Sequence, residues 1–186
     1  NEYIQKLQQR WIKMFKISEE WSNQISWEAF QRSCNIKTKW KSIWMAKHNA
    51  RIGSVMKNMY RRKHSDTKLC PNCDQIECTD HIFKCKSARS TEVFNKEIEE
   101  VKKFLESTTS KEITTAVLAV IISLRNENAQ EINKVDNKLL TLVTDQVTLG
   151  QRSTLGGAWI NRWVKAQECH LLKIKSKRCP IIWLSL

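Results

Sequence analysis

The sequence predicts an all-α fold, a multi-helix domain that carries one small hairpin-plus-helix insert. Helix breakers are scarce, since the 186 residues include only 4 Gly and 2 Pro. Apolar residues recur at intervals of three and four along most of the chain, which is the period of an amphipathic helix. No longer segment alternates between apolar and polar residues as a strand would. With 41% hydrophobic residues and 8 Trp, the helices have enough apolar side chains to bury a core.

The N-terminal segment, residues 1–67, contains three apolar stripes at helical spacing. The first stripe ends near Ser18, and a second helix is expected to begin at Ser26. The third stripe runs through a basic stretch, whose Lys and Arg residues lie largely off the stripe. The apolar positions are Ile4, Leu7, Trp11 and Met14, then Trp27 and Phe30, then Trp40, Ile43, Trp44, Ile52, Val55, Met56 and Met59.

Four further helices are predicted in the C-terminal segment, residues 87–186. Three of them follow a Ser or Asp whose side chain can accept a hydrogen bond from a free N–H of the first turn. The AVLAVIISL run in the second is apolar on most sides, which indicates a central helix. The third should end at Gly150, and the fourth should include Trp159. The expected helix starts are Ser87, Ser110, Asp136 and the neighbourhood of Gly157.

The insert, residues 68–86, contains the string CPNCDQIECTDHIFKC. Cys70 and Cys73 are separated by two residues, the usual spacing of two thiolates on a metal-binding turn. His81 and Cys85 are four apart and would share one face of a short helix, with Thr79 and Asp80 as its cap and first turn. Two thiolates on a turn with an imidazole and a thiolate on a helix form a closed tetrahedral set for one structural Zn²⁺. Such a set leaves no position for a catalytic water.

Two other interpretations of the cysteines stay open. The 7 Cys could form a disulfide or be inert buried thiols, although the odd number and the lack of a recognisable signal peptide favour reduced thiols in an intracellular protein. Cys78 lies three residues before His81 and could replace it as a ligand. The other three, Cys34, Cys169 and Cys179, share no spacing with the cluster. The longest apolar run, around Ala116 to Leu124, is too short to cross a membrane, so no membrane partner is expected.

The formal charge of +13 is unevenly distributed. Residues 35–68 contain ten Lys or Arg and one acid, Asp66, whereas residues 86–145 are nearly neutral. A basic segment next to a metal cluster is typical of proteins that bind phosphate backbones, but solubility, or cations at a solvated helix end, would also explain it. The predicted nucleic-acid-binding residues are Lys47, Arg51, Lys57, Arg61, Arg62, Lys63, His64 and Lys68.

The sequence offers little sign of catalysis. The Asp residues are few and form no paired-carboxylate motif of the kind that holds magnesium in polymerases and nucleases. No glycine-rich phosphate loop is present, and no nucleophile has an evident His and acid partner. A deaminase signature is also missing, because here the His follows the CPNC string instead of preceding it. We therefore expect a chain without enzymatic activity.

Several of these residues together resemble a region found downstream of reverse-transcriptase domains in non-LTR-like retroelement proteins, notably of algae and protists. In that group a helix of the form W…KH…G…M..RR precedes CPxC…HxxxC, and a helical tail with a Q…G…L.G….W…Q pattern follows. Cys169 and His170 stand where the group has an aromatic pair, and Cys78 stands where it commonly has Thr. The residues that carry the resemblance are Trp27, Trp44, Lys47, His48, Arg62 and the cluster, then Gln146, Gly150, Leu155, Gly157, Trp163 and Gln167.

The resemblance implies a non-catalytic C-terminal module of a reverse-transcriptase polyprotein, which contacts RNA or DNA. We expect one structural zinc, backbone and shape recognition with little base preference, and an intracellular location in a nuclear or cytoplasmic ribonucleoprotein. The rival hypothesis is a zinc-stabilised helical scaffold that binds protein, such as the polymerase portion of the same polyprotein. The predicted segments, 1–67, 68–86 and 87–186, are expected to pack together as one unit.

Overall fold

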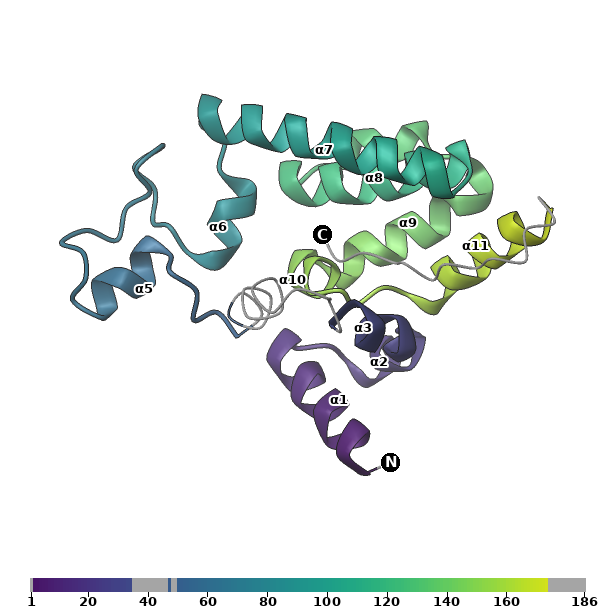
Figure 1. The fold of residues 1–186 in the computed structure, drawn as a ribbon, viewed down its shortest axis with the longest axis horizontal. Helices are drawn as coiled ribbons and strands as arrows, with labels where there is room; N and C mark the ends of the chain where they lie inside the picture. Colours follow the sequence, from purple (N-terminus) through teal and green to yellow (C-terminus); the bar gives the residue numbers. More distant parts are fainter. Residues whose placement is uncertain (1, 35–46, 48–49, 174–186) are drawn as a thin grey trace.

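The computed structural model describes residues 2–34, 47 and 50–173, and within these ranges the fold is all-α, as predicted (Figure 1). Two long helices, α7 (Ala88–Thr108) and α8 (Lys111–Asn126), run side by side. The N-terminal helices lie at one end of the molecule, and α5 (Met56–Arg61) and α6 (Thr79–Lys84) lie on the opposite side from α11 (Asn161–Lys173). No described helix is both long enough and apolar enough to cross a membrane.

The main hydrophobic core surrounds α8. Ala116, Val117 and Val120 of this helix are fully buried, which confirms the predicted central position of the AVLAVIISL run. A 3-10 turn, η1 (Gln130–Lys134), and helix α9 (Asn137–Leu149) pack against it. The predicted N-caps are also confirmed, because the side chains of Ser87, Ser110 and Asp136 accept hydrogen bonds from the first turns of α7, α8 and α9.

The N-terminal helices are α1 (Glu2–Phe15), α2 (Glu19–Gln24) and α3 (Trp27–Cys34). A smaller apolar cluster joins them, in which the ring of Trp11 stacks on Phe15 and meets Phe30 edge to face. Ser26 precedes α3 as predicted, and its Oγ accepts a hydrogen bond from the Ala29 N–H. The predicted apolar positions at Trp40, Ile43 and Trp44 lie outside the described residues.

The prediction of one long final helix beginning near Gly157 is wrong. Instead, the short helix α10 (Gln151–Leu155) follows Gly150, and α11 begins only at Asn161. The segment between them is not helical, because the Trp159 carbonyl accepts from the Ser26 N–H and Ile160 forms an antiparallel bridge with Ile25. Gly157, with a φ of 94°, turns the chain into this bridge. These backbone contacts attach the N-terminal helices to the core.

The third apolar stripe also does not continue as one helix through Ile52. That residue is exposed and precedes α5, which begins only at Met56. Arg51 has a left-handed backbone with a φ of 58°, which interrupts helical geometry at this point. The Asn58 side chain then holds the loop by donating to the carbonyls of Arg51 and Gly53. The division into segments 1–67, 68–86 and 87–186 stays a prediction.

Candidate metal centre

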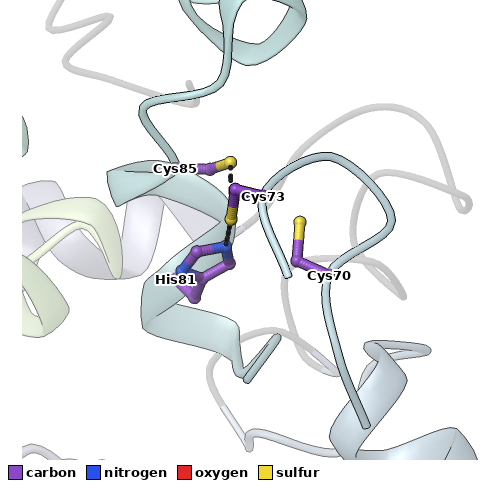
Figure 2. A group of neighbouring side chains, drawn as sticks. All are labelled: Cys70, Cys73, His81 and Cys85. Carbon is purple, nitrogen blue, oxygen red and sulfur yellow. Dashed lines mark hydrogen bonds between the residues drawn. The ribbon is translucent and has the colours of Figure 1, made fainter. Parts of the chain in front are cut away.

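Cys70, Cys73, His81 and Cys85 converge on one point, with ligand atoms that all lie within 4.8 Å of one another (Figure 2). The Cys73 Sγ is the middle of the group, 3.2 Å from the His81 Nε2 and 3.6 Å from the Cys85 Sγ. Cys70 and Cys85 are buried, whereas Cys73 and His81 are partly exposed. No disulfide is formed by the cysteines whose placement is described. The four predicted ligands are therefore together as free thiols and an imidazole.

A short turn positions the first two ligands. The Cys70 N–H donates to the Gln75 carbonyl oxygen at 2.6 Å, and Leu69 pairs with Ile76 in an isolated antiparallel bridge. The expected hairpin is thus present in its smallest form. Asp74 closes the turn with a φ of 57°, a left-handed conformation that Asp adopts more readily than most residues. The backbone folds the two thiols inward without a hydrophobic core of its own, since Leu69 and Ile76 are exposed.

Helix α6 positions the other two ligands. His81 lies on its first turn, and Cys85 is its C-cap, with the Cys85 N–H donating to the His81 carbonyl at 2.7 Å. The predicted cap at Thr79 is shifted by one residue, because the N-cap is Cys78 and Thr79 begins the helix. Cys78 is also not one of the four converging residues. The geometry favours His81 as the fourth ligand over Cys78.

The site fits a metal ion of the zinc type. Ligands in tetrahedral contact with Zn²⁺ at about 2.3 Å for sulfur are separated by about 3.8 Å from one another. The separations at Cys73 are slightly shorter than this, and the whole set spans no more than 4.8 Å. Thiolates with imidazole are the donors that select zinc over magnesium or calcium. A metal bound by all four would be closed to water and would supply structural stabilisation.

The protonation of the thiols makes metal binding depend on pH. Burial raises the pKa of the Cys70 thiol to about 11. Burial also opposes ionisation of Cys85, but hydrogen bonds from Ser87 and Ser90 outweigh it and lower the pKa of Cys85 to about 6. Without a metal, the Cys85 thiol therefore ionises more readily than the Cys70 thiol. Because the ligand form is the thiolate, a metal must displace the Cys70 proton.

We expect the zinc affinity to rise at least about tenfold per pH unit between about pH 6.5 and pH 8.5, because one proton leaves Cys70 on binding. Competition with a chromophoric chelator at three pH values measures this slope. Calorimetry in buffers of different ionisation enthalpy counts the released protons independently. An affinity that stays constant over this range would contradict the assignment of Cys70 as a thiol that loses its proton to bind.

Sequence reasoning missed the residue that joins this centre to the helical core. Arg125, at the end of α8, is only 4% exposed. Its guanidinium donates to the carbonyl oxygens of Phe83 at 2.6 Å and Cys85 at 2.8 Å. Its contacts continue to the Thr91 hydroxyl and to the ring of Phe94, whose centroid lies 4.2 Å from the Arg125 Cζ. The one sequence signal for this role is the position of Arg125 directly after the apolar AVLAVIISL run.

A second connection runs through Asp80 on the first turn of α6. Its carboxylate pairs with Arg51 and with Arg152 of α10, and its carbonyl accepts from Gln151. Burial opposes ionisation of Asp80, but the hydrogen bonds from Arg152 and Arg51 outweigh it and hold the pKa of the carboxyl below its usual value. The segment with the four candidate ligands, residues 68–86, is therefore attached on two sides, to α8 through Arg125 and to α10 through Asp80.

The predicted nucleic-acid-binding residues all have exposed side chains. They lie on α5 and in the segments on either side of it. The α5 helix is attached to the segment with the candidate ligands because Glu77 accepts from the N–H groups of Met56 and Lys57. Arg51 is engaged by Asp80, and Arg62 donates to the Ile52 carbonyl. Among the described residues, no ion pair involves Lys47, Lys57, Arg61, Lys63, His64 or Lys68.

No protein-family model, curated protein or solved structure matches the chain.

Proposed function

We propose that the chain is a zinc-stabilised, non-catalytic module that binds RNA or DNA within a retroelement reverse-transcriptase polyprotein. The observation that supports this is a set of exposed cations next to the metal centre. Arg61, Arg62, Lys63, His64 and Lys68, together called the basic lip, follow one another from the end of α5 to the metal-binding turn. Asp66 is the one acid within this stretch. A concentration of cations on a fixed element attracts phosphate groups.

Zinc would act on the basic lip through α5. A helix of six residues is too short to be stable alone in water. It is held by Glu77, which lies between the two pairs of metal ligands in the chain and contacts Met56 and Lys57. Fixing the ligands fixes Glu77, and through it the helix that ends at the basic lip. The metal would thereby reduce the entropy that the lip loses when it contacts a strand.

The target class follows from the type of side chain. The lip consists of Lys, Arg and His, whose charges attract phosphates, and it contains no Asn or Gln to read the edge of adenine. We therefore propose recognition of the nucleic-acid backbone with little sequence preference.

The test is fluorescence anisotropy with labelled RNA and DNA of several sequences, over a salt range of about 50 to 200 mM. The variant replaces Arg61, Lys63 and Lys68 with Gln, which leaves the internal contacts of Arg51 and Arg62 intact. Three lost phosphate contacts should reduce the slope of log affinity against log salt by about 3 and the affinity by about 10- to 100-fold at roughly 100 mM.

The matched control removes the same number of charges elsewhere. Lys96, Lys111 and Lys138 are exposed, belong to the nearly neutral middle of the chain, and take part in no ion pair that the described residues show. Their replacement with Gln should change the affinity much less than the lip variant does. Equal losses of affinity in both variants would show that binding responds to net charge alone. If the wild type does not bind RNA or DNA at about 50 mM salt, the nucleic-acid proposal is wrong.

A protein-binding scaffold is the second candidate, and one specific feature favours it. An apolar cavity of about 360 Å³ opens between α6, α7 and α8. Ile82 and Val93 line it and are 51% and 55% exposed. Side chains of this type on a rigid helical surface are suited to an apolar partner segment, such as one from the polymerase portion of the same polyprotein. Binding that persists at high salt and is lost in Val93→Glu would support this candidate.

A further inference from the structure

Arg125 is a buried cation without a carboxylate partner among the residues that the structure describes. Its guanidinium forms no ion pair with any described carboxylate, although the residue is only 4% exposed. Enclosing a charge without a counter-charge is strongly unfavourable, so such arginines are normally paired. The neutral carbonyls of Phe83 and Cys85 satisfy its N–H groups but do not balance its charge. The position therefore calls for an anion nearby.

The occupied metal centre supplies such an anion. A Zn²⁺ ion bound by three thiolates and a neutral imidazole has one net negative charge, because three negative ligands exceed the two positive charges of the metal. Two of the thiolates, Cys70 and Cys85, are 3% and 2% exposed, so water neutralises this charge poorly. The guanidinium of Arg125 donates a hydrogen bond to the backbone carbonyl of one of them, Cys85.

The neighbouring cations are already engaged elsewhere. Lys84 pairs with Glu127, whereas Lys86 is exposed to solvent and donates to the Arg125 carbonyl at 3.0 Å and to the Asn126 Oδ1 at 2.7 Å. Arg51 is paired with Asp80. Among the described cations near the metal centre, Arg125 is thus the buried one that no carboxylate pairs with, and its charge can balance that of the centre.

We propose that Arg125 is the built-in counter-charge of the zinc centre, a positioning residue that couples zinc occupancy to the docking of α6 on α8. This inference rests on the zinc centre of the proposed function but not on nucleic-acid binding. The occupied centre and the guanidinium neutralise each other across the Cys85 backbone, while the hydrogen bonds to Phe83 and Cys85 hold α6 in place.

Two variants of the full-length chain separate charge from hydrogen bonding. Arg125→Lys keeps the positive charge with a different donor geometry, whereas Arg125→Gln keeps N–H donors for the carbonyls without the charge. The zinc dissociation constant of each is measured by competition with a chromophoric chelator, and the unfolding temperature is measured with zinc and with EDTA. Arg125→Gln should weaken zinc binding about 10- to 100-fold, the usual effect of removing an outer-shell partner. Arg125→Lys should retain most of the affinity.

The control is Lys84→Gln, which removes a neighbouring cation that already has a partner in Glu127. Its zinc affinity should stay within about twofold of the wild type, as expected for a partly exposed ion pair. A merely structural role for Arg125 would lower the unfolding temperature of both variants equally with zinc and with EDTA. The proposed role lowers it in Arg125→Gln mainly in the presence of zinc.

The outcomes are distinct. Equal loss of zinc affinity in the Lys and Gln variants, or wild-type affinity in Arg125→Gln, would overturn the inference. If Arg125→Gln is unfolded without metal, zinc is titrated into it and refolding is followed by circular dichroism. The zinc concentration at half-refolding then compares the zinc affinities of the variants. Failure of both variants to fold at any zinc concentration would assign Arg125 to packing and overturn it as well. A wild type without bound zinc would overturn the metal centre too, whereas failure to bind RNA and DNA would affect the proposed function alone.

Discussion

Replacing Cys73 with Ser is expected to abolish stoichiometric zinc binding and to unfold the turn from Lys68 to Glu77. Cys73 is the ligand whose sulfur lies next to both the His81 Nε2 and the Cys85 Sγ, so its loss removes the middle of the set. The lost zinc contribution is large, since structural zinc supplies on the order of 10 kcal/mol in small peptides. No single packing contact in this segment approaches that value.

The segment has little else to hold it together. Its turn is closed by one isolated bridge, and both residues of that bridge are exposed. The α6 helix has six residues and no side-chain hydrogen bond at its N-cap. The attachments through Arg125 and Asp80 hold α6 to the core but do not constrain the turn with Cys70 and Cys73. The turn is therefore expected to open first when the metal is removed.

Metal analysis and native-state hydrogen exchange measure this result. Zinc should fall from about one equivalent to near zero in Cys73→Ser, and the amide N–H groups of Cys70 and Glu77 should lose protection. Amides in the middle of α8 should keep theirs, because that helix lies in the main core. Cys169→Ser is the matched control, since Cys169 is an exposed thiol on α11 outside the cluster. Zinc retained at wild-type level in Cys73→Ser would contradict the metal centre.

The features that sequence reasoning predicted are those with a local chemical cause. Ser87, Ser110 and Asp136 cap helices because a short polar side chain bonds to the N–H groups two or three residues ahead. The ligand set also has a local cause, since the spacing of Cys70 and Cys73 and that of His81 and Cys85 each fix one pair. These spacings were enough to identify the four residues that the fold brings together.

The missed features depend on residues far apart in the chain. Arg125 contacts Cys85 across forty positions, and no local pattern predicts that a cation at the end of an apolar helix turns inward. Trp159 has the spacing of a helical residue, but its carbonyl accepts a hydrogen bond from the Ser26 N–H. This tertiary contact prevents the helix that the local apolar period predicts. Gln146 is a third example. Its polar side chain and helical spacing do not predict burial, yet the residue is fully buried.

Gln146→Ala is expected to destabilise the protein by about 3 to 5 kcal/mol, the range of large core truncations that also leave polar groups unpaired. Its Nε2 donates to the Thr154 Oγ1 at 2.9 Å and to the Ala158 carbonyl at 3.1 Å. Its Oε1 accepts from the Ile160 N–H at 3.0 Å and from the Trp163 Nε1–H at 3.1 Å. All four of its hydrogen-bonding positions are therefore used, and the truncation removes every one.

The effect should be large because these contacts join three helices at one buried point. Gln146 lies on α9, Thr154 on α10, and Trp163 on α11, where the indole is 1% exposed. Ile160 is also 1% exposed, so the desolvation cost of the two stranded N–H groups is not recovered from water. Urea unfolding of Gln146→Ala against the exposed Gln130→Ala, which should change stability by less than about 0.5 kcal/mol, measures the difference.

Gln146→Glu tests the same network through pH. The introduced side chain keeps an acceptor for Ile160 and Trp163. When protonated it has one O–H donor in place of the two N–H donors to Thr154 and Ala158, and when ionised it loses that donor and places a charge at a fully buried position. Burial should raise the pKa of the introduced carboxyl in the folded state above its unfolded value. The stability that remains at low pH is therefore lost as the pH rises through the folded pKa.

The Gln146→Glu variant should accordingly be closest to the wild type near pH 5 and much less stable near pH 8, as measured by urea unfolding at each pH. The wild type at the same two pH values is the control, because Gln146 itself does not titrate. A destabilisation of Gln146→Ala below about 1 kcal/mol, or one of Gln146→Glu that does not change with pH, would mean that the network contributes little to joining the helices.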